Sequence, residues 1–343
     1  MRIALDAMGG DFGAAPNVEA AVQAAREFGY EIALVGQQEL LRPLLNQYNT
    51  AGLQLPIVHA SEVIEMHEHP SQAVKARKHS SMVIGVQMVR NGDADAFVTM
   101  GNTGGALAAS VLYLGRLKGI HRACLATAFP TIKGPVLLCD LGANTDCQPE
   151  WLAQFALMGS IYAERVMHIR NPRVALLSNG EEETKGNQAV QEAHQLLKRA
   201  PINFVGNVQG YDLPAGAADV FVADGFVGNV LLKFAEGMKS FLEDALRTAF
   251  TSSIPARLGA LLAKDAIKQT LRQKLDYEEV GGAVLLGVDG VVIVGHGRSK
   301  ARAIKSAIRR AAEAVERGVL DAIEQGLQAM PRSALELDHT TRG

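Results

Sequence analysis

A glycine-rich stretch near residue 100 is the first place where this sequence can bind a charged ligand. Residues 99–110 have the sequence TMGNTGGALAAS, an apolar strand end followed by small residues suited to a helix. Without a Cβ, the chain can turn sharply here and bring backbone N–H groups close to a ligand; the glycines are Gly101, Gly104 and Gly105. Asn102 or Thr103 can cap the helix, whose positive end favours an anion such as phosphate. A tight turn with helix-packing glycines is the alternative.

Two polar side chains are candidates for catalytic groups. Lys185 lies in the polar turn SNGEEETKGN after an apolar run, where its ammonium group can reach neighbouring strand ends. Asn229, in ADGFVGN, can donate hydrogen bonds to a ligand. A solvated lysine and a helix-starting asparagine are the alternatives. Cys147 is a weaker candidate nucleophile, because no basic residue lies beside it in the sequence to stabilise a thiolate.

Several standard motifs are missing. The first strand is not followed by G-x-G-x-x-G, and neither G-x-x-x-x-G-K-[ST] nor the G-x-S-x-G elbow occurs. The sequence therefore disfavours a standard nucleotide fingerprint and a serine hydrolase. His67 and His69 alternate in EMHEHP as metal ligands can, but an exposed polar loop fits that segment better. We predict no metal site.

Strands and helices alternate along the chain and must position these groups. Apolar runs such as RIALDAM, EIALVG and DAFVTM precede helices that we predict at 17–28, 38–49, 71–91 and 103–116. A longer helix is expected from about 227 and a last one from about 299 to 326. The alternation predicts an α/β fold with a mostly parallel sheet covered on both faces.

Polar, glycine-containing segments follow five of the predicted strands. They are DAMGGDFG, MGNTGG, DLGANTD, SNGEEETKGN and ADGFVGN. Ligands bind at the carboxyl ends of strands in open α/β sheets, so we expect these segments to line one site. Because no repeat or low-complexity linker marks a boundary, we predict one catalytic unit over residues 1–329, with room for two lobes. A helical protrusion is expected at about 245–276 and a loose tail over 330–343.

Composition excludes several classes of protein. The chain has 343 residues, 48% of them hydrophobic and 20% charged, as in a folded globular protein. Its net charge of -2 gives no overall attraction for nucleic acid, so we expect no nucleic-acid partner. Three cysteines without a disulfide pattern indicate a reducing compartment. We therefore expect a cytoplasmic protein.

Seven motifs, taken in order, resemble the bacterial phosphate acyltransferase family of phospholipid synthesis. They are DAMGGD, AVKARKHSSM, GNTGG, DLGAN, NGEEETKGN, DGFVGN and a late HG, between about residues 2 and 320. The resemblance implies transfer of a fatty acyl group from acyl carrier protein to inorganic phosphate, which gives acyl phosphate. It also implies a homodimer and a three-layer α/β/α, Rossmann-like fold similar to isocitrate and isopropylmalate dehydrogenases. No cofactor is implied.

The resemblance places the family's catalytic lysine and asparagine at Lys185 and Asn229. We expect phosphate and substrate at the glycine-rich strand ends, namely at Asp6, Gly9, Gly10, Gly101, Asn102, Thr103, Gly104, Gly105, Asp140, Asn144, Asp224 and Gly228. Ser178, where asparagine is expected, and the basic segment 296–302 depart from the family pattern.

The reaction implied by the resemblance needs little covalent chemistry from the protein. Phosphate is itself a nucleophile, so the enzyme can work by holding it in line with the thioester carbonyl. Charge developing on the carbonyl oxygen needs preorganised donors, for which backbone N–H groups, Asn229 and Lys185 are candidates. Neither a metal nor a nucleotide is required.

An acidic carrier protein and an anionic membrane both require local basic surfaces. We expect a carrier-protein contact at Lys75, Arg77 and Lys78, with a solvated helix face as the alternative. Residues 253–275 are basic and carry two apolar faces, which predicts two short helices with a break near Lys264 and Asp265. We expect this segment to contact the inner face of the cell membrane through Leu258, Leu261 and Leu262. Packing of these helices in a dimer is the alternative.

Three other functions stay open at this point. A related fold can transfer acetyl between coenzyme A and phosphate, and a metal-dependent dehydrogenase can also use it. The third is a noncatalytic module that binds phosphate or acyl carrier protein.

Overall fold

The computed structural model describes residues 1–263 and 281–334. Its strands are β1 (Arg2–Asp6), β2 (Glu31–Gly36), β3 (Ile57–His59), β4 (Ala96–Thr99), β5 (Cys124–Phe129), β6 (Val136–Cys139), β7 (Arg173–Leu177), β8 (Asn203–Val208), β9 (Val220–Val222), β10 (Ala283–Leu286) and β11 (Val291–Val294). Over the described part of the chain they form one sheet of 11 strands in the order β3-β2-β1-β4-β11-β10-β5-β6-β9-β7-β8.

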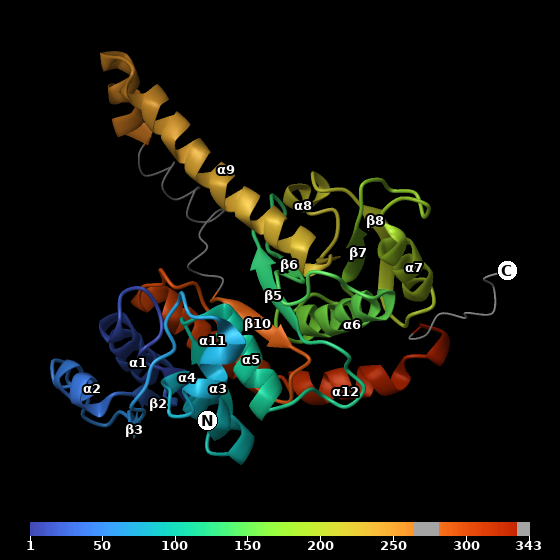
Figure 1. Ribbon diagram of the computed structural model, residues 1–343. Helices are drawn as coiled ribbons and strands as arrows, with labels where there is room; N and C mark the ends of the chain where they lie inside the picture. The colour runs from blue at the N-terminus through green and yellow to red at the C-terminus, as the bar shows by residue number, and fades with distance from the viewer. Residues whose placement is uncertain (264–280, 335–343) are drawn as a thin grey trace.

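Helices cover both faces of this sheet (Figure 1). They are α1 (Ala14–Phe28), α2 (Gln38–Leu45), α3 (Pro70–Ala76), α4 (Ser81–Asn91), α5 (Thr103–Tyr113), α6 (Pro149–Arg165), α7 (Gln188–Leu197), α8 (Asp212–Ala215), α9 (Gly225–Thr251), α11 (Ala301–Glu316) and α12 (Val319–Ala329). A short 3₁₀ turn, η2, spans Arg332–Ala334.

Two helices predicted as continuous are each divided in two. The predicted helix 71–91 is interrupted after α3, where Arg77 leaves the helical region, and α4 starts afresh with the Ser80 side chain accepting from Val83 N. The predicted helix 299–326 is interrupted at Gly318, whose φ of 59° places it in the left-handed region. Both interruptions are local, so the order of elements stays as predicted.

The direction of the strands divides the sheet into two groups. Strands β3, β2, β1, β4 and β11 are parallel. Three antiparallel pairings follow, between β11 and β10, β10 and β5, and β5 and β6. The parallel strands β6, β9, β7 and β8 therefore run opposite to the first group. The sheet is mostly parallel, as predicted, but its carboxyl ends point in two directions.

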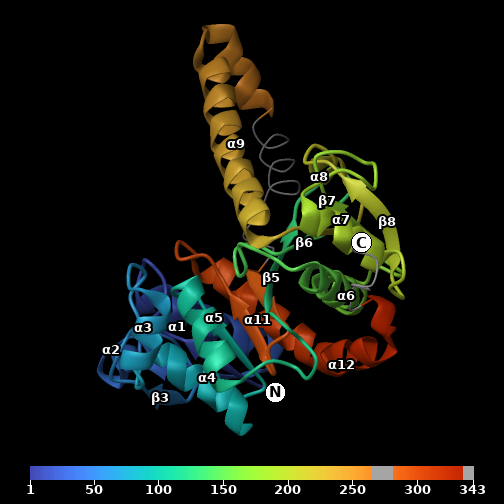
Figure 2. The same cartoon turned by 45° about the vertical axis from the view of Figure 1, so that its right-hand side comes forward.

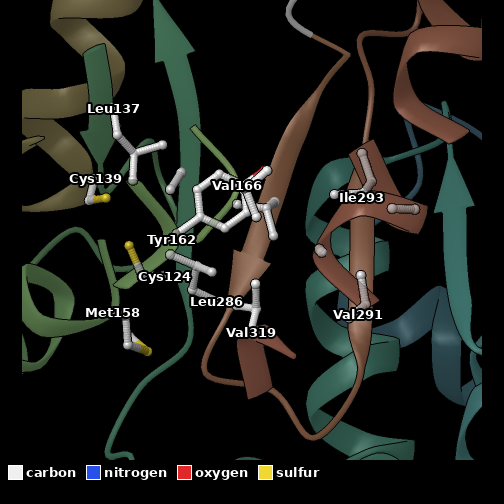
Figure 3. Packing of buried hydrophobic residues seen from close by; sticks show 14 of the residues in the cluster. Cys124, Leu137, Cys139, Met158, Tyr162, Val166, Leu286, Val291, Ile293 and Val319 are labelled. Atoms are coloured by element: carbon white, nitrogen blue, oxygen red, sulfur yellow. The ribbon is translucent and has the colours of Figure 1, made fainter. Parts of the chain in front are cut away.

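A hydrophobic core lies on each face of the sheet, as alternation along the strands requires. Ile3 and Leu5 of β1 join a cluster with α1, α6, α7, α11 and α12, whereas Ala4 between them joins the opposite cluster with α3, α4 and α5. Figure 3 shows part of the first cluster, where Tyr162 of α6 lies among side chains of the central strands. The result is a three-layer α/β/α arrangement.

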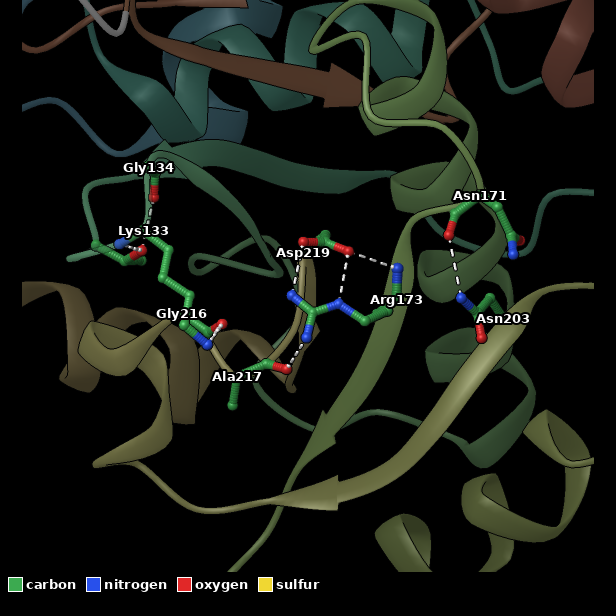
Figure 4. Close-up of polar contacts among 9 residues, drawn as sticks. Lys133, Gly134, Asn171, Arg173, Asn203, Gly216, Ala217 and Asp219 are labelled. Carbon is green, nitrogen blue, oxygen red and sulfur yellow. Dashed lines mark hydrogen bonds and ion pairs between the residues drawn. The ribbon is translucent and has the colours of Figure 1, made fainter.

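An ion pair links the start of β7 to the segment that leads into β9. The Arg173 guanidinium donates through Nε to Asp219 Oδ2 at 3.0 Å and through Nη2 to Oδ1 at 2.9 Å, and Nη1 donates to Ala217 O (Figure 4). This two-point geometry ties the first residue of β7 to the residue just before β9. Strands β7 and β9 are thereby held in register.

Helix α9 extends far beyond the sheet, and a helical segment at 254–263 lies beside its outer end (Figures 1 and 2). The rest of the predicted protrusion, including the break near Lys264 and Asp265, lies outside the described residues. At the other end of the fold, Met330 and Ala334 are buried, so the first residues of the predicted tail pack against the core.

Candidate active site

A cavity of about 330 Å³ lies between the start of α5 and the N-terminal part of α9, where residues 229–236 line it, over the central strands. Apolar side chains of β5, β10 and β11 line it, including Leu125, Leu285 and Val294. Its polar side chains include Thr103 and His296, which follow strands of the first group, and Asn229, which follows β9 of the second group. The cavity therefore joins residues that follow strands of opposite direction, and it is the candidate active site.

Asp6 holds together the loops that follow β1 and β4. Its buried carboxylate accepts hydrogen bonds from Thr99 Oγ1 at 2.7 Å, Gly9 N at 3.1 Å and Met8 N at 3.2 Å. Burial raises the pKa of the Asp6 carboxyl, while these hydrogen bonds act in the opposite direction. Asp6 lies outside the cavity lining and holds in place the loops beside it.

The glycines near Asp6 permit close packing of backbones. A Cβ on Gly9 would lie 2.7 Å from Gly101 N, and one on Gly10, whose φ is 99°, would lie 3.1 Å from Gly297 O. None of these three residues, Gly9, Gly10 or Gly101, lines the cavity. Their role in this structure is to bring three loops together.

The start of α5 combines a cap with tight packing. Asn102, one of the two predicted candidates, is the N-cap, and its Oδ1 accepts from Gly105 N at 2.9 Å. Its Nδ2 also donates to Met66 O and Glu68 O, which ties the cap to the preceding loop. A Cβ on Gly104 would come within 2.6 Å of Pro70 Cγ, so this glycine is needed for packing. Thr103 and Gly104 line the cavity with the N-terminus of α5.

The DLGAN segment already holds an anion of its own. The Asp140 carboxylate is fully buried and accepts from backbone N–H groups of Leu125, Leu141, Gly142, Ala143 and Asn144. Asn144 Nδ2 donates to it as well, at 2.9 Å. Burial raises the pKa of Asp140 and these donors oppose the rise. The N–H groups that we expected to bind substrate phosphate here are therefore occupied by Asp140.

Two glycines bring α9 directly onto that segment. Asp224 caps α9 by accepting from Val227 N at 2.8 Å. A Cβ on Gly228 would overlap the carbonyl oxygen of Asp140, and one on Gly225 would lie 2.8 Å from Asn144 O. Because the helix approaches so closely, Asn229 reaches the cavity beside Gly142. Gly228 and Asp224 thus position Asn229.

Lys185 lies in an exposed loop on the other side of the first turn of α9. The loop is held by Gly186 N, which donates to Asn179 Oδ1 at 2.7 Å, and by Gln191 Nε2, which donates to Thr184 O. A second cavity of about 290 Å³ lies beside it. Its lining includes Ser178, Gly186, Asn187, Asp224 and Val227. Lys185 is among the lining residues of neither cavity, whereas Asn229 lines the first.

Two charged residues of the first cavity, Lys233 and Glu236, escaped the sequence analysis, and His296 entered it only as part of the late HG motif, without a role. Asn229, Lys233 and Glu236 are spaced i, i+4 and i+7, which puts them on one helical face, so this spacing was the available signal. Lys233 Nζ lies 2.8 Å from Glu236 Oε2. Both side chains reach solvent, so the pair holds Lys233 only weakly.

The predicted contact residues for partners are unequal. Arg77 is engaged by Glu68, with Nη2–Oε1 at 2.9 Å and Nε–Oε1 at 3.0 Å, whereas Lys75 and Lys78 are exposed. Leu258, Leu261 and Leu262 are 59%, 68% and 88% exposed. Among the residues described, no helix has the length and apolar character needed to cross a bilayer.

Cys147 is protonated at neutral pH. Burial raises the pKa of its thiol to about 12, and its Sγ lies 3.5 Å from Asn144 O. No group of three or more histidine, cysteine or acidic residues that could hold a metal ion occurs in the described ranges.

Comparisons with known proteins agree along nearly the whole chain. A family model described as "Fatty acid synthesis protein" matches residues 1–322. A phosphate acyltransferase from Heliobacterium modesticaldum is 51% identical over 326 residues, 95% of this chain and 97% of that protein. One from Dictyoglomus turgidum is 48% identical over 329 residues, 95% of this chain and 98% of that protein.

Solved structures confirm the predicted fold. A phosphotransacetylase from Streptococcus pyogenes superposes with a TM-score of 0.61 at 20% identity, covering 92% of this chain and 94% of that one. A 4-hydroxythreonine-4-phosphate dehydrogenase from Klebsiella pneumoniae gives 0.54 at 13% identity, covering 92% and 99%. Both have the isocitrate dehydrogenase-like fold. At these identities the likeness is one of fold alone.

Proposed function

This chain belongs to the phosphate acyltransferase family of fatty acid and phospholipid synthesis, and we propose that it moves a fatty acyl group from acyl-acyl carrier protein to inorganic phosphate. The product is an acyl phosphate. The family match over residues 1–322 carries the proposal. The cavity supports it, because polar groups for phosphate and apolar side chains for an acyl group line the same space.

The cavity has opposite walls suited to the two reactants. Phosphate binds at the N-terminus of α5, where Thr103 and Gly104 line the cavity and the helix dipole favours an anion. Asn229 donates from the facing first turn of α9 to the thioester oxygen, which becomes negative during transfer. The enzyme contributes position and hydrogen bonds, and phosphate contributes the nucleophile.

The catalytic lysine of this proposal is Lys185, which acts from outside the cavity in the present arrangement. Its loop and the start of α9 line the second cavity together, through Gly186, Asn187 and Val227, which supports a role for Lys185 beside Asn229. Lys233 is the lysine that lines the cavity here, so the two residues make different contributions that substitution can separate.

The proposed donor is tested by offering palmitoyl-acyl carrier protein and acetyl-coenzyme A separately, each with radiolabelled phosphate. We expect acyl phosphate from the carrier-protein thioester only. Faster turnover of acetyl-coenzyme A would replace the proposal with an acetyltransferase, and phosphate binding without turnover of either donor would indicate a noncatalytic module.

The acidic carrier protein is proposed to approach the exposed lysines Lys75 and Lys78 on and just after α3. Arg77 offers an acidic partner less positive charge than we expected, because it forms an ion pair with Glu68. This contact weakens as ionic strength rises, since exposed charges are screened over about 10 Å at 0.1 M salt.

We also propose that the protein is a homodimer in the cytoplasm that touches the inner membrane surface. Large apolar side chains are exposed along α9, including Phe234 and Phe241 at 65% and 64%, and a second copy of the chain would bury them. The exposed leucines of segment 254–263 would enter the lipid headgroup region. A contact with the membrane surface would let the fatty acyl product pass into the bilayer without crossing water.

A further inference from the structure

His296 lines the candidate active site from a direction that neither Asn229 nor the start of α5 occupies. It follows β11 by two residues, is exposed, and lines the cavity together with Thr103 and Asn229. The reaction as described so far gives it no role.

We propose that His296 is a further catalytic residue, whose Nε2–H donates a hydrogen bond to the thioester oxygen as acyl transfer makes it negative. The inference rests on the proposed function and adds a second side-chain donor to Asn229. Both residues line the same cavity from different elements, and a hydrogen bond from each to the same oxygen would stabilise its developing charge.

The hydrogen bond at the other ring nitrogen assigns the tautomer. The backbone N–H of Arg298 donates to Nδ1 of His296 at 3.1 Å, so Nδ1 is an acceptor. A neutral imidazole has one donor and one acceptor nitrogen, and its proton is therefore on Nε2. The ring offers the cavity a donor.

The backbone that carries His296 is fixed on three sides. Gly295 N donates to Thr99 O at 2.8 Å, Ser299 N donates to His296 O at 2.9 Å, and Asp11 N donates to Gly297 O at 2.8 Å. A Cβ on Gly295 would overlap Met100 Sδ, and one on Gly297 would lie 2.9 Å from Asp11 Oδ1. A donor held in this way needs little reorganisation when charge develops.

The step balances without a proton leaving the ring. A phosphate oxygen forms a bond to the carbonyl carbon, and the carbonyl π electrons move to the oxygen, where the Nε2–H hydrogen bond strengthens. The intermediate then collapses: the C=O bond re-forms, the C–S bond breaks, and the electron pair leaves with the thiolate. His296 keeps its proton throughout.

Steady-state kinetics with palmitoyl-acyl carrier protein and radiolabelled phosphate test the proposal. We expect His296→Phe to lower kcat by tenfold or more with little change in either KM, because the lost interaction belongs to the transition state, and a loss of tenfold corresponds to roughly 1.4 kcal/mol. His296→Gln, whose amide can donate from a similar position, should recover part of kcat.

His59→Phe is the matched control. His59 Nδ1 also lies near a backbone N–H, that of Gln38 at 3.4 Å, but His59 belongs to β3 at the edge of the sheet. This variant should keep wild-type kinetics, and thermal unfolding should show that all three variants are folded.

Each outcome has a distinct meaning. Unchanged kcat in His296→Phe overturns the inference, as does a rise in KM alone, which would assign the ring to ground-state binding. Equal loss in the Phe and Gln variants with a lowered Tm also overturns it, because the role would then be structural. If the wild-type enzyme forms no acyl phosphate, it is the proposed function that fails.

Discussion

Several residues that the sequence suggests as substrate-binding groups form hydrogen bonds within the protein itself. The carboxylate of Asp140 occupies the N–H groups of its own loop, and Asp6 accepts from the loops after β1 and β4. Such residues hold the loops around the candidate active site in their conformation. The polar residues that line the cavity include Asn229, Lys233 and His296, which come from α9 and from the loop after β11.

The catalytic roles proposed for Asn229 and Lys185 predict a loss of turnover without unfolding. We expect Asn229→Ala and Lys185→Ala each to lower kcat by at least tenfold, roughly 1.4 kcal/mol of barrier. Lys233→Ala is the comparison, because this lysine lines the cavity and should chiefly raise the KM for phosphate. Near-wild-type kinetics in both of the first two variants would reject the assigned roles.

The buried carboxyl of Asp6 predicts a pH dependence of stability. Burial raises its pKa in the folded protein, so folding favours the protonated form. The stabilisation is therefore fully present below the unfolded pKa, about 3.9, and is lost as the pH rises through the raised value.

Chemical denaturation of the wild type and of Asp6→Asn between pH 4 and pH 7 measures this effect. The difference in free energy of unfolding, wild type minus variant, should fall as the pH increases. A difference that stays constant or grows would show that the hydrogen bonds to Asp6 outweigh its burial.

At the scale of elements, the packing of α5 against α3 explains the glycine at position 104. Gly104→Ala would gain helix propensity worth about 1 kcal/mol, but its Cβ would lie 2.6 Å from Pro70 Cγ. We expect the steric clash to outweigh the gain in helix propensity, so the Tm should fall. Gly104→Val should lower the Tm further.

Gly237→Ala provides the control, because Gly237 lies within α9 and a Cβ there would meet no atom within 4 Å. This variant should keep or raise the Tm. If Gly104→Ala is as stable as Gly237→Ala and only the phosphate KM rises, the glycine serves the anion and not the helix packing.

At the scale of the whole molecule, the exposed apolar side chains of α9 predict self-association. A charge in place of Phe241 would be desolvated by a second copy, so Phe241→Glu should convert a dimer to a monomer in sedimentation equilibrium. Ile132→Glu, a substitution at a residue 73% exposed and outside α9, should leave the mass unchanged. A monomeric wild type would contradict the proposed dimer.

The leucines of segment 254–263 predict binding to anionic membranes. In flotation with liposomes containing phosphatidylglycerol, the wild type should bind at low salt and dissociate as salt increases. Leu261→Glu should bind less, while Leu112→Glu, at an exposed leucine of α5, should bind like the wild type. Protein that stays at the bottom of the gradient at every salt concentration would rule out the contact.

The amino-acid sequence by itself determined the class of fold and the family. Strand and helix periodicities are local, so the alternation of elements was visible without tertiary contacts. The ordered motifs from DAMGGD to the late HG carried the family resemblance, and the family model matches residues 1–322. The cap at Asn102 was also a local signal, because it depends on residues only three apart.

Only the tertiary structure decided which of these residues line the candidate active site. The Asp140 carboxylate accepts a hydrogen bond from Leu125 N, and Gly228 packs closely against the carbonyl oxygen of Asp140. Both contacts join segments that are far apart in the chain. The reversal of strand direction between β11 and β6 likewise depends on which strands pair. Lys185 and Asn229 stand out equally in the sequence, yet α9 lies against the 140–144 loop so that Asn229 lines the cavity and Lys185 does not. Side-chain partners of this kind are set by packing over long sequence separations, which no local pattern encodes.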